Sequence, residues 1–295
     1  MRVFVTGASG FVGSAVVKEL ITAGHQVLGL ARSGSSAENI RKAGAEVLMG
    51  DVNDLGTLEK GAAQCDAVIH TAFNHDFSRF KANCEDDRKV IGALGAALAG
   101  SARPLIITSG VGLLNLGRIA TEDDTPAGSD ITPRAASEEA AAAAAAKGTK
   151  TYIVRLPPTV HGKGDHGFVP MIMNMAKEKD QSVYIGEGKN RWPAVHRLDA
   201  AVLYRLIAEQ QPAQKIYNAV AEEGIPFRDI AEAIGKGLHV PVVSKTGKDA
   251  EAHFTWFTHF ASFDCPASSA KTRQTLGWQP KQPGLMEDLT PGIYF

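Results

Sequence analysis

A glycine-rich segment near the start of the chain, TGASGFVG from Thr6 to Gly13, limits the fold more than any other feature of the sequence. It follows the apolar run RVFVT and precedes a helical pattern in which Val12, Val16 and Leu20 repeat every fourth position. In such a loop, Gly7 turns the chain, Gly10 opens a helix whose amides can face a phosphate, and Gly13 lets that helix approach the sheet. The strand, loop and helix together predict a dinucleotide site.

The first half of the chain alternates short β-branched runs with helical patterns, which is typical of βαβ units and a parallel sheet. We therefore predict an α/β protein with a Rossmann doubly wound parallel sheet and a smaller C-terminal substrate lobe. Strands are expected at 2–6, 26–30, 46–50, 66–70, 104–108, 151–156 and 216–220, and helices at 11–24, 36–43, 54–63, 78–99, 132–147 and 227–234.

The alternation fades after residue 156, where Gly, Pro and His become frequent. We expect an NADP-binding Rossmann domain over residues 1–160 and 194–220, with the substrate lobe and a polar, Gly- and Pro-rich tail over 161–193 and 221–295. The alanine-rich helix that ends near residue 147 has small side chains that would allow close packing, and two subunits of a homodimer could meet there.

The segment GLARSGSS, at the end of the second expected strand, bears on the choice of cofactor. An NAD-selective site usually has a carboxylate about 20 residues beyond the glycines. Here Arg32 could pair with a 2′-phosphate and Ser33 could donate to it, while the first acid nearby is Glu38. The segment predicts NADP(H).

Composition limits the partners. The chain has 31 Lys and Arg against 32 Asp and Glu, so its net charge of -1 gives no general attraction to nucleic acid or to an anionic membrane. Its three cysteines form no CxxC pair. With no signal peptide and no apolar stretch near the ~18 residues of a membrane span, we expect a cytoplasmic protein that acts on a small molecule.

Several further segments in order resemble the extended short-chain dehydrogenases/reductases, the epimerase/dehydratase-like group. They are VIHTA at 68–72, RLPPTVHG at 155–162, GEGKNRWPAVHRLDAA at 186–201 and LGWQP at 276–280, beside the glycine loop and the pair Asp51-Val52. With the glycine loop, the resemblance implies cofactor contacts from Thr6, Gly7, Ser9, Gly10, Phe11, Val12, Gly13, Arg32, Ser33, Asp51, Val52, Ala72, Thr108 and Pro157.

One departure from that family concerns its catalytic pair, a Tyr followed four residues later by Lys. No Tyr in this sequence has a Lys at that spacing; alignment through Ser137 puts Arg134 at the Tyr position and Glu138 at the Lys position. Arg134 could polarise a carbonyl group, whereas Glu138 would raise the pKa of a neighbouring acid. Alternatively, the two form an i, i+4 ion pair on the helix surface.

Other polar residues could supply the chemistry. The acid/base candidates are His161 and His166, and Ser109 could hydrogen-bond a substrate oxygen. For substrate contacts we expect His75, which follows the fourth strand, together with Phe168, Arg191 and Trp192. His70, His196 and Asp199 are interpreted as structural, and no metal site is expected because the histidine pair lacks a third ligand.

Three functions remain open at this point. The first is an NADP(H)-dependent oxidoreductase for a small carbonyl or alcohol substrate, by a mechanism without the usual Tyr and Lys. The second is a nucleotide-sugar epimerase or dehydratase, which Lys189 and Arg191 would suit. The third is a non-catalytic protein that responds to NADP(H).

Overall fold

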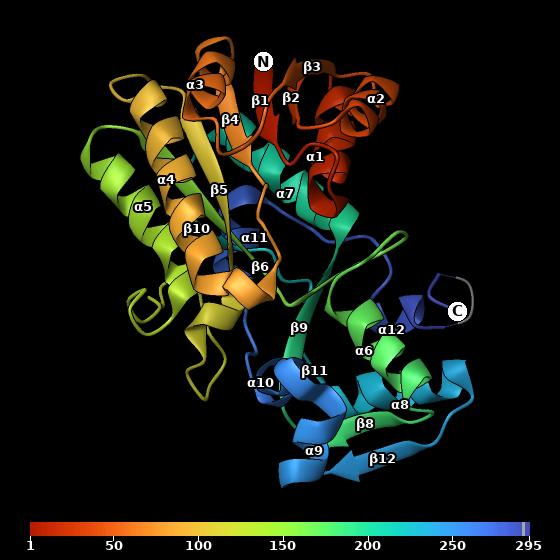
Figure 1. Ribbon diagram of the computed structural model, residues 1–295. Coiled ribbons are helices and arrows are strands. Elements are labelled where there is room, and N and C mark those ends of the chain that lie inside the picture. Colours follow the sequence, from red (N-terminus) through yellow and green to blue (C-terminus); the bar gives the residue numbers. More distant parts are fainter. Residues whose placement is uncertain (291–292) are drawn as a thin grey trace.

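A seven-stranded parallel sheet forms the larger of two lobes in the computed structural model, which describes residues 1–290 and 293–295 (Figure 1). The strand order is β10-β6-β5-β4-β1-β2-β3, so the order reverses between β1 and β4, and ligands of such sheets bind at that point. The strands are β1 (Arg2–Thr6), β2 (Gln26–Ala31), β3 (Glu46–Met49), β4 (Ala67–His70), β5 (Pro104–Gly110), β6 (Lys150–Leu156) and β10 (Ile216–Asn218).

Helices cover both faces of this sheet, as a doubly wound fold requires. One core lies under α1 (Phe11–Thr22), α2 (Gly34–Lys42), α7 (Arg197–Gln210) and α11 (Ala270–Leu276). The other lies under α3 (Leu55–Ala63), α4 (Phe80–Leu98) and α5 (Ala136–Ala146). Side chains therefore alternate along each strand between the two cores: Val3 and Val5 enter the first, and Phe4 enters the second.

The smaller lobe has its own apolar core and two small sheets. Strand β9 (Arg191–His196) lies between β11 (Glu222–Pro226) and β7 (Thr159–His161), and β8 (Ser182–Ile185) pairs with β12 (Val242–Lys245). Its helices are α6 (Phe168–Glu178), α8 (Phe227–Leu238), α9 (Gly247–Phe254), α10 (Thr258–Ser262) and α12 (Leu285–Asp288). Four single 3-10 turns connect elements: η1 (Phe77–Arg79), η2 (Val111–Leu114), η3 (Pro133–Ala135) and η4 (Thr255–Phe257).

The expected α/β fold and all seven expected strands are confirmed, while the helices differ in detail. The helix expected from residue 132 begins as the turn η3, and α5 itself starts at Ala136. The tail, described from the sequence as polar and rich in Gly and Pro, contains α9, α10, α11 and α12, because Phe254, Phe257, Leu276 and Leu285 are buried and anchor them.

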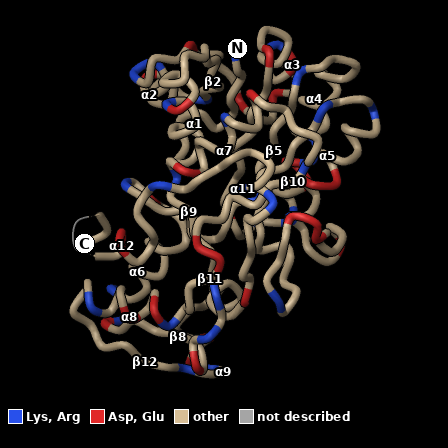
Figure 2. The backbone as a smooth tube through the Cα atoms, turned by 180° about the vertical axis from the view of Figure 1, so that it is seen from behind, with Lys and Arg blue, Asp and Glu red and all other residues tan. Residues whose placement is uncertain are grey.

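The charged residues are mixed on the folded chain, as the near-zero net charge suggests. Lys and Arg are interspersed with Asp and Glu over both lobes (Figure 2). Among the residues that the structure describes, no helix has the length and apolarity to cross a bilayer.

Candidate cofactor and substrate site

The glycine loop joins β1 to α1 and fits a dinucleotide closely. Gly7 adopts φ +68°, and a Cβ there would lie 2.7 Å from the backbone nitrogen of Ala72. A Cβ at Gly13 would lie 2.0 Å from the carbonyl oxygen of Gly7. Gly10 is the N-cap of α1, so the helix dipole faces the loop. These positions form a cradle without side chains, which is the shape a pyrophosphate needs.

Substitution of Gly13 by alanine tests this cradle. We expect NADPH affinity to fall at least tenfold, because the new methyl group must push α1 away from Gly7. Isothermal titration calorimetry measures the change. Gly92→Ala is the matched control, because a Cβ there meets no atom within 4 Å. Equal affinities of the two variants would contradict the cradle.

The other residues expected in the loop fall into two groups. Ser9 is exposed at the loop, and Phe11 and Val12 are half-buried at the start of α1, where Arg197 lies over the Phe11 ring at 5.0 Å. Thr6, in contrast, is fully buried, and its hydroxyl lies 2.6 Å from Nδ1 of His70. Its side chain is therefore part of the protein interior.

The segment after β2 presents Arg32 and a helix N-terminus together. Arg32 is exposed, directly beyond the last residue of β2. Ser33 caps α2, and its Oγ accepts a hydrogen bond from the amide of Ser36. Glu38 instead pairs with Lys42 one turn further on, at 2.7 Å. A cation and helix amides thus meet at the end of β2, and the nearest acid is engaged elsewhere.

A cavity of about 50 Å³ continues from this edge of the sheet toward β4 and α4. It contains two residues expected to contact the cofactor, Val52 and Ala72, and is lined further by Phe73, Asn74, Asn83, Asp86, Asp87 and Val90. Asp51, just outside it, accepts hydrogen bonds from Asn53.

Two expected cofactor residues lie at the carboxyl ends of the next strands. Pro157 is buried directly after β6. Thr108 lies within β5, where its hydroxyl donates to the carbonyl of His70 at 2.8 Å and bonds to the Tyr204 hydroxyl at 2.7 Å. The Thr108 hydroxyl is therefore already engaged within the protein.

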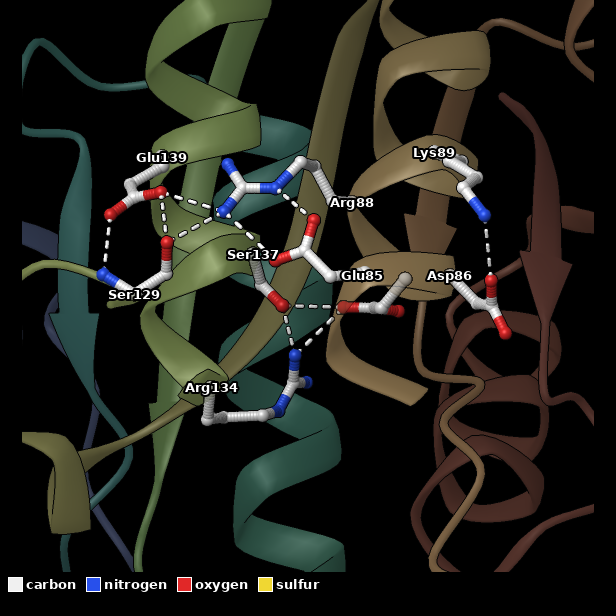
Figure 3. Close-up of polar contacts among 9 residues, drawn as sticks. Glu85, Asp86, Arg88, Lys89, Ser129, Arg134, Ser137 and Glu139 are labelled. Carbon is white, nitrogen blue, oxygen red and sulfur yellow. Dashed lines mark hydrogen bonds and ion pairs between the residues drawn. The ribbon is translucent and has the colours of Figure 1, made fainter. Parts of the chain in front are cut away.

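A buried polar network runs from β1 to η3 behind this edge. Nε2 of His70 lies 2.8 Å from Oδ1 of Asp87, and Nη1 of Arg134 donates to Oδ2 of Asp87 at 2.7 Å. Ser137 bonds to both Asp87 and Arg134 (Figure 3). Burial raises the pKa of Asp87, but the nearby Arg134 and His70 outweigh burial and hold it well below its usual range. Because the ionised carboxylate only accepts, His70 donates to it through Nε2, and Nδ1 bonds to the Thr6 hydroxyl. The expectation of a satisfied core histidine at position 70 is confirmed.

Arg134 keeps hydrogen-bonding capacity beyond this network. Three of its five N–H donors have partners among the described residues: two go to Asp87 and Ser137, and one goes from Nη2 to the backbone oxygen of Thr108 at 3.0 Å. Its guanidinium carbon lies 4.1 Å from the centroid of the Phe73 ring. The group is thus fixed at the carboxyl end of β5, over an aromatic ring.

Arg134 and Glu138 do not form the surface ion pair. Glu138 instead binds Ser109, the residue expected to hydrogen-bond a substrate oxygen, and Arg155. Glu138 points into the protein and is 7% exposed. Arg155 donates to it twice, at 2.8 Å and 2.7 Å, and Ser109 donates at 2.7 Å. Because Ser109 is itself buried, its hydroxyl holds this carboxylate. Glu138 is buried because the phase of α5 turns position 138 toward β5 and β6.

The expected histidines are separated by the structure. His75 and His166 are both exposed, and their charges interact, whereas His161 is fully buried. Desolvation, then the charge of Arg134 and then that of His166, lowers the pKa of His75. Nδ1 of His161 lies 2.6 Å from Asp288 of α12, and its ring packs edge-on against His196. His75 and Arg134 both lie against the Phe73 ring, His166 lies against the Phe11 ring, and His161 belongs to the interior of the smaller lobe.

Two of the residues expected to contact the substrate, Trp192 and Arg191, are engaged within the protein. Trp192 is fully buried in the core of the smaller lobe, and Arg191 is bound to Asp264 by hydrogen bonds of 3.1 Å and 2.9 Å. Strand β9 is buried from Trp192 to His196, and Trp192 enters the core of the smaller lobe. Phe168, at the start of α6, is half-buried and packs on Phe260 at 4.9 Å between ring centroids.

Sequence reasoning missed Asp87 and Asn83, which belong to the apolar face of α4. Both are buried and lie one helical turn apart, in phase with Val90, Ile91 and Leu94. Two polar residues on a buried helix face require partners, and this phase was the available signal.

Known proteins support the class that the cradle defines. The model of a family described as NAD(P)H-binding matches residues 7–181, so the chain belongs to the NAD(P)H-binding family. An uncharacterised protein of Schizosaccharomyces pombe is 50% identical over 296 residues, with 100% of both chains covered. A sterol-4-alpha-carboxylate 3-dehydrogenase (decarboxylating) of Dictyostelium discoideum is 29% identical, covering 77% of this chain and 73% of its own.

Solved structures agree on the fold. A dTDP-glucose 4,6-dehydratase from Streptomyces venezuelae superposes with a TM-score of 0.79 at 18% identity, covering 98% of this chain and 96% of the other. The chain therefore has the fold of the extended short-chain dehydrogenases/reductases.

Proposed function

We propose that the protein is an NADP(H)-dependent oxidoreductase that reduces a small carbonyl compound without the usual Tyr and Lys. The observation that carries the proposal is the placement of Arg134. Its guanidinium is held by Asp87 at the carboxyl end of β5, the edge of the sheet that binds cofactor in this fold, and it has N–H donors to spare. Reductases among the relatives support the reaction class, including a 2-alkyl-3-oxoalkanoate reductase of Stenotrophomonas maltophilia at 27% identity.

In the proposed mechanism, the cofactor supplies a hydride when bound in the cradle between Gly7 and Gly13. Arg134 donates hydrogen bonds to the substrate carbonyl oxygen and stabilises the negative charge that develops there. Asp87 keeps the guanidinium oriented. His75, close enough to Arg134 to feel its charge, holds the proton that the alkoxide receives. Arg134 itself stays protonated throughout.

NADP(H) rather than NAD(H) is proposed on the basis of Arg32 and the N-terminus of α2. We expect Arg32→Ala to weaken NADPH binding roughly 10- to 100-fold, because a charge-assisted hydrogen bond contributes about 1.5–3 kcal/mol. NADH binding should change less than twofold, since that cofactor has no 2′-phosphate. Calorimetric titration with both cofactors measures this. Arg41→Ala, exposed at the far end of α2, is the control, and equal losses for both cofactors would remove the assignment.

A direct assay tests the reaction. NADPH oxidation is followed at its absorbance band with a panel of aldehydes and ketones, and we expect substrate-dependent turnover. A protein that binds NADPH but turns over no carbonyl compound would instead match a non-catalytic NADP(H)-responsive protein, the third hypothesis.

A nucleotide-sugar epimerase or dehydratase is less well supported than a reductase. Such a substrate carries a diphosphate, which basic side chains of the smaller lobe would have to bind. Arg191 is paired with Asp264, and Lys189 is paired with Glu187 at 2.6 Å with a side chain that is 80% exposed. Stabilisation of the protein by a nucleoside diphosphate sugar would favour this alternative.

Assembly into a homodimer through α5 stays a proposal. Ala142, Ala143, Ala145 and Ala146 are exposed on that helix, and sedimentation analysis of the purified chain measures its state.

A further inference from the structure

A band of aromatic side chains runs from the proposed reaction site into the smaller lobe. It begins at Phe73, the ring beneath Arg134, which lies 5.1 Å from the ring of His75 and 6.3 Å from that of Phe80. We call the following six residues the aromatic wall: Phe73, Phe77, Phe80, Phe168, Trp256 and Phe260.

Phe77 is the centre of the wall and joins the two lobes. It lies on η1, directly after the nucleotide-binding edge, and stacks on Trp256 of η4 with ring centroids 5.1 Å apart and planes inclined by 26°. Its ring is also 5.7 Å from Phe80, 5.5 Å from Phe260 and 5.9 Å from Phe168. Segments far apart in the sequence thus converge on one aromatic ring, whose centroid lies 6.3 Å from that of His75.

The wall differs from the aromatic core of the smaller lobe in its exposure. Trp192, Phe227 and Phe257 are fully buried and fill that core. In the wall, Trp256 remains 51% exposed, and the five phenylalanines are only half-buried. Adjoining aromatic side chains that keep contact with solvent beside polar reacting groups are typical of a ligand-binding surface.

Backbone strain at Thr255 is a second, independent observation. This β-branched residue adopts φ +52° at the end of α9, in the left-handed region that such residues rarely enter. Trp256, which stacks on Phe77, directly follows Thr255 in this turn. Strain of this kind persists where the surrounding structure enforces it and clusters at ligand sites.

We propose that the aromatic wall is the substrate subsite and that it selects uncharged carbonyl compounds bearing an aromatic ring. The ring would stack on Phe77 and Trp256, with its carbonyl group directed toward Arg134 and His75. The pairing of Arg191 with Asp264 agrees with an uncharged substrate. This inference rests on the proposed reductase function for the position of the carbonyl group.

Steady-state kinetics of the whole chain with NADPH tests the subsite. For Phe77→Ala and Trp256→Ala we expect kcat/KM for benzaldehyde to fall roughly tenfold or more, while kcat/KM for propanal changes less than threefold. Trp256→Phe should retain most of the activity on benzaldehyde. Tyr184→Ala removes an aromatic ring of the smaller lobe that lies outside the aromatic wall. It should alter kcat/KM for neither benzaldehyde nor propanal. Equal losses with benzaldehyde and propanal would mean that the wall only holds the lobes together, and would overturn the proposal.

A binding measurement keeps the subsite separate from the reaction. Benzyl alcohol is titrated calorimetrically into the protein saturated with NADP+, where no turnover needs to be observed. Binding that weakens at least fivefold in Trp256→Ala, with thermal stability unchanged, supports the subsite even if no aldehyde is reduced. Identical binding to Trp256→Ala and to the unmodified protein would overturn the subsite even if reductase activity is found.

Discussion

Replacement of Arg134 by leucine is expected to lower kcat for carbonyl reduction about 10²- to 10³-fold, the usual cost of removing a donor to a developing oxyanion. The guanidinium is fixed by Asp87 and by the Thr108 carbonyl, so a substrate oxygen would gain its hydrogen bonds without reorganisation. NADPH affinity should change little, because the cradle between Gly7 and Gly13 is separate from it. Stopped-flow and steady-state rates measure the loss.

Control variants separate this role from a structural one. The leucine variant leaves Asp87 buried without its cation, so Arg134→Lys and the double variant Arg134→Leu with Asp87→Asn are needed beside it. Lys147→Leu removes an exposed cation at the end of α5 without touching the network. If the double variant folds, binds NADPH and retains full kcat, Arg134 has no part in the reaction.

The Arg134→Leu variant should also have a different pH dependence of carbonyl reduction. Desolvation and the charge of Arg134 lower the pKa of His75 from its ordinary value of 6.5. If His75 supplies the proton, reduction is fast below that pKa and slows as the pH rises through it. Loss of Arg134 raises the pKa of His75, so the midpoint of the profile for kcat/KM should move up toward 6.5. An unmoved midpoint would exclude His75 as the group that titrates.

Features that depend on neighbours in the sequence could be predicted from it. The strands, the helices and the cradle at Gly7 and Gly13 follow from residue periodicity and from glycines at the end of a strand, both of which are local signals. Arg32 and Ser33 could be placed for the same reason, since they directly follow the second strand.

The chemistry of the site depends on pairs that meet only in the folded chain. Arg134 is 47 residues from its partner Asp87, and Glu138 is 17 from Arg155, so the local i, i+4 rule favoured a pair that the fold does not form. Trp192 and His161 were expected at the site because of their chemistry. In the folded chain, Trp192 lies in the core of the smaller lobe, and His161 is buried against Asp288. The aromatic wall brings together residues 77 and 256, which no sequence window contains.

Arg155→Met is expected to destabilise the protein by about 3–5 kcal/mol, because it leaves the buried Glu138 carboxylate without its cation. Arg155 is 0% exposed, and its guanidinium also donates to the backbone oxygen of Asp124 at 2.9 Å. For a chain of this size the loss corresponds to a fall in Tm of roughly 5–8 °C. Urea denaturation and calorimetry measure the free energy of unfolding and the Tm.

Two further variants measure how much the ion pair of Arg155 and Glu138 contributes to the free energy of unfolding. Arg228→Met breaks an exposed ion pair with Glu232 and should cost less than about 1 kcal/mol. The double variant Arg155→Met with Glu138→Leu should regain most of the lost stability, because it removes the unpaired charge together with its partner. Should Arg155→Met behave like Arg228→Met, the carboxylate would have access to water or to another cation, and Glu138 would again be available for chemistry at the substrate. The expected large difference instead means that Glu138, which our alignment assigns to the Lys position of the family, holds β5, β6 and α5 together, and that proton transfer falls to other groups near Arg134.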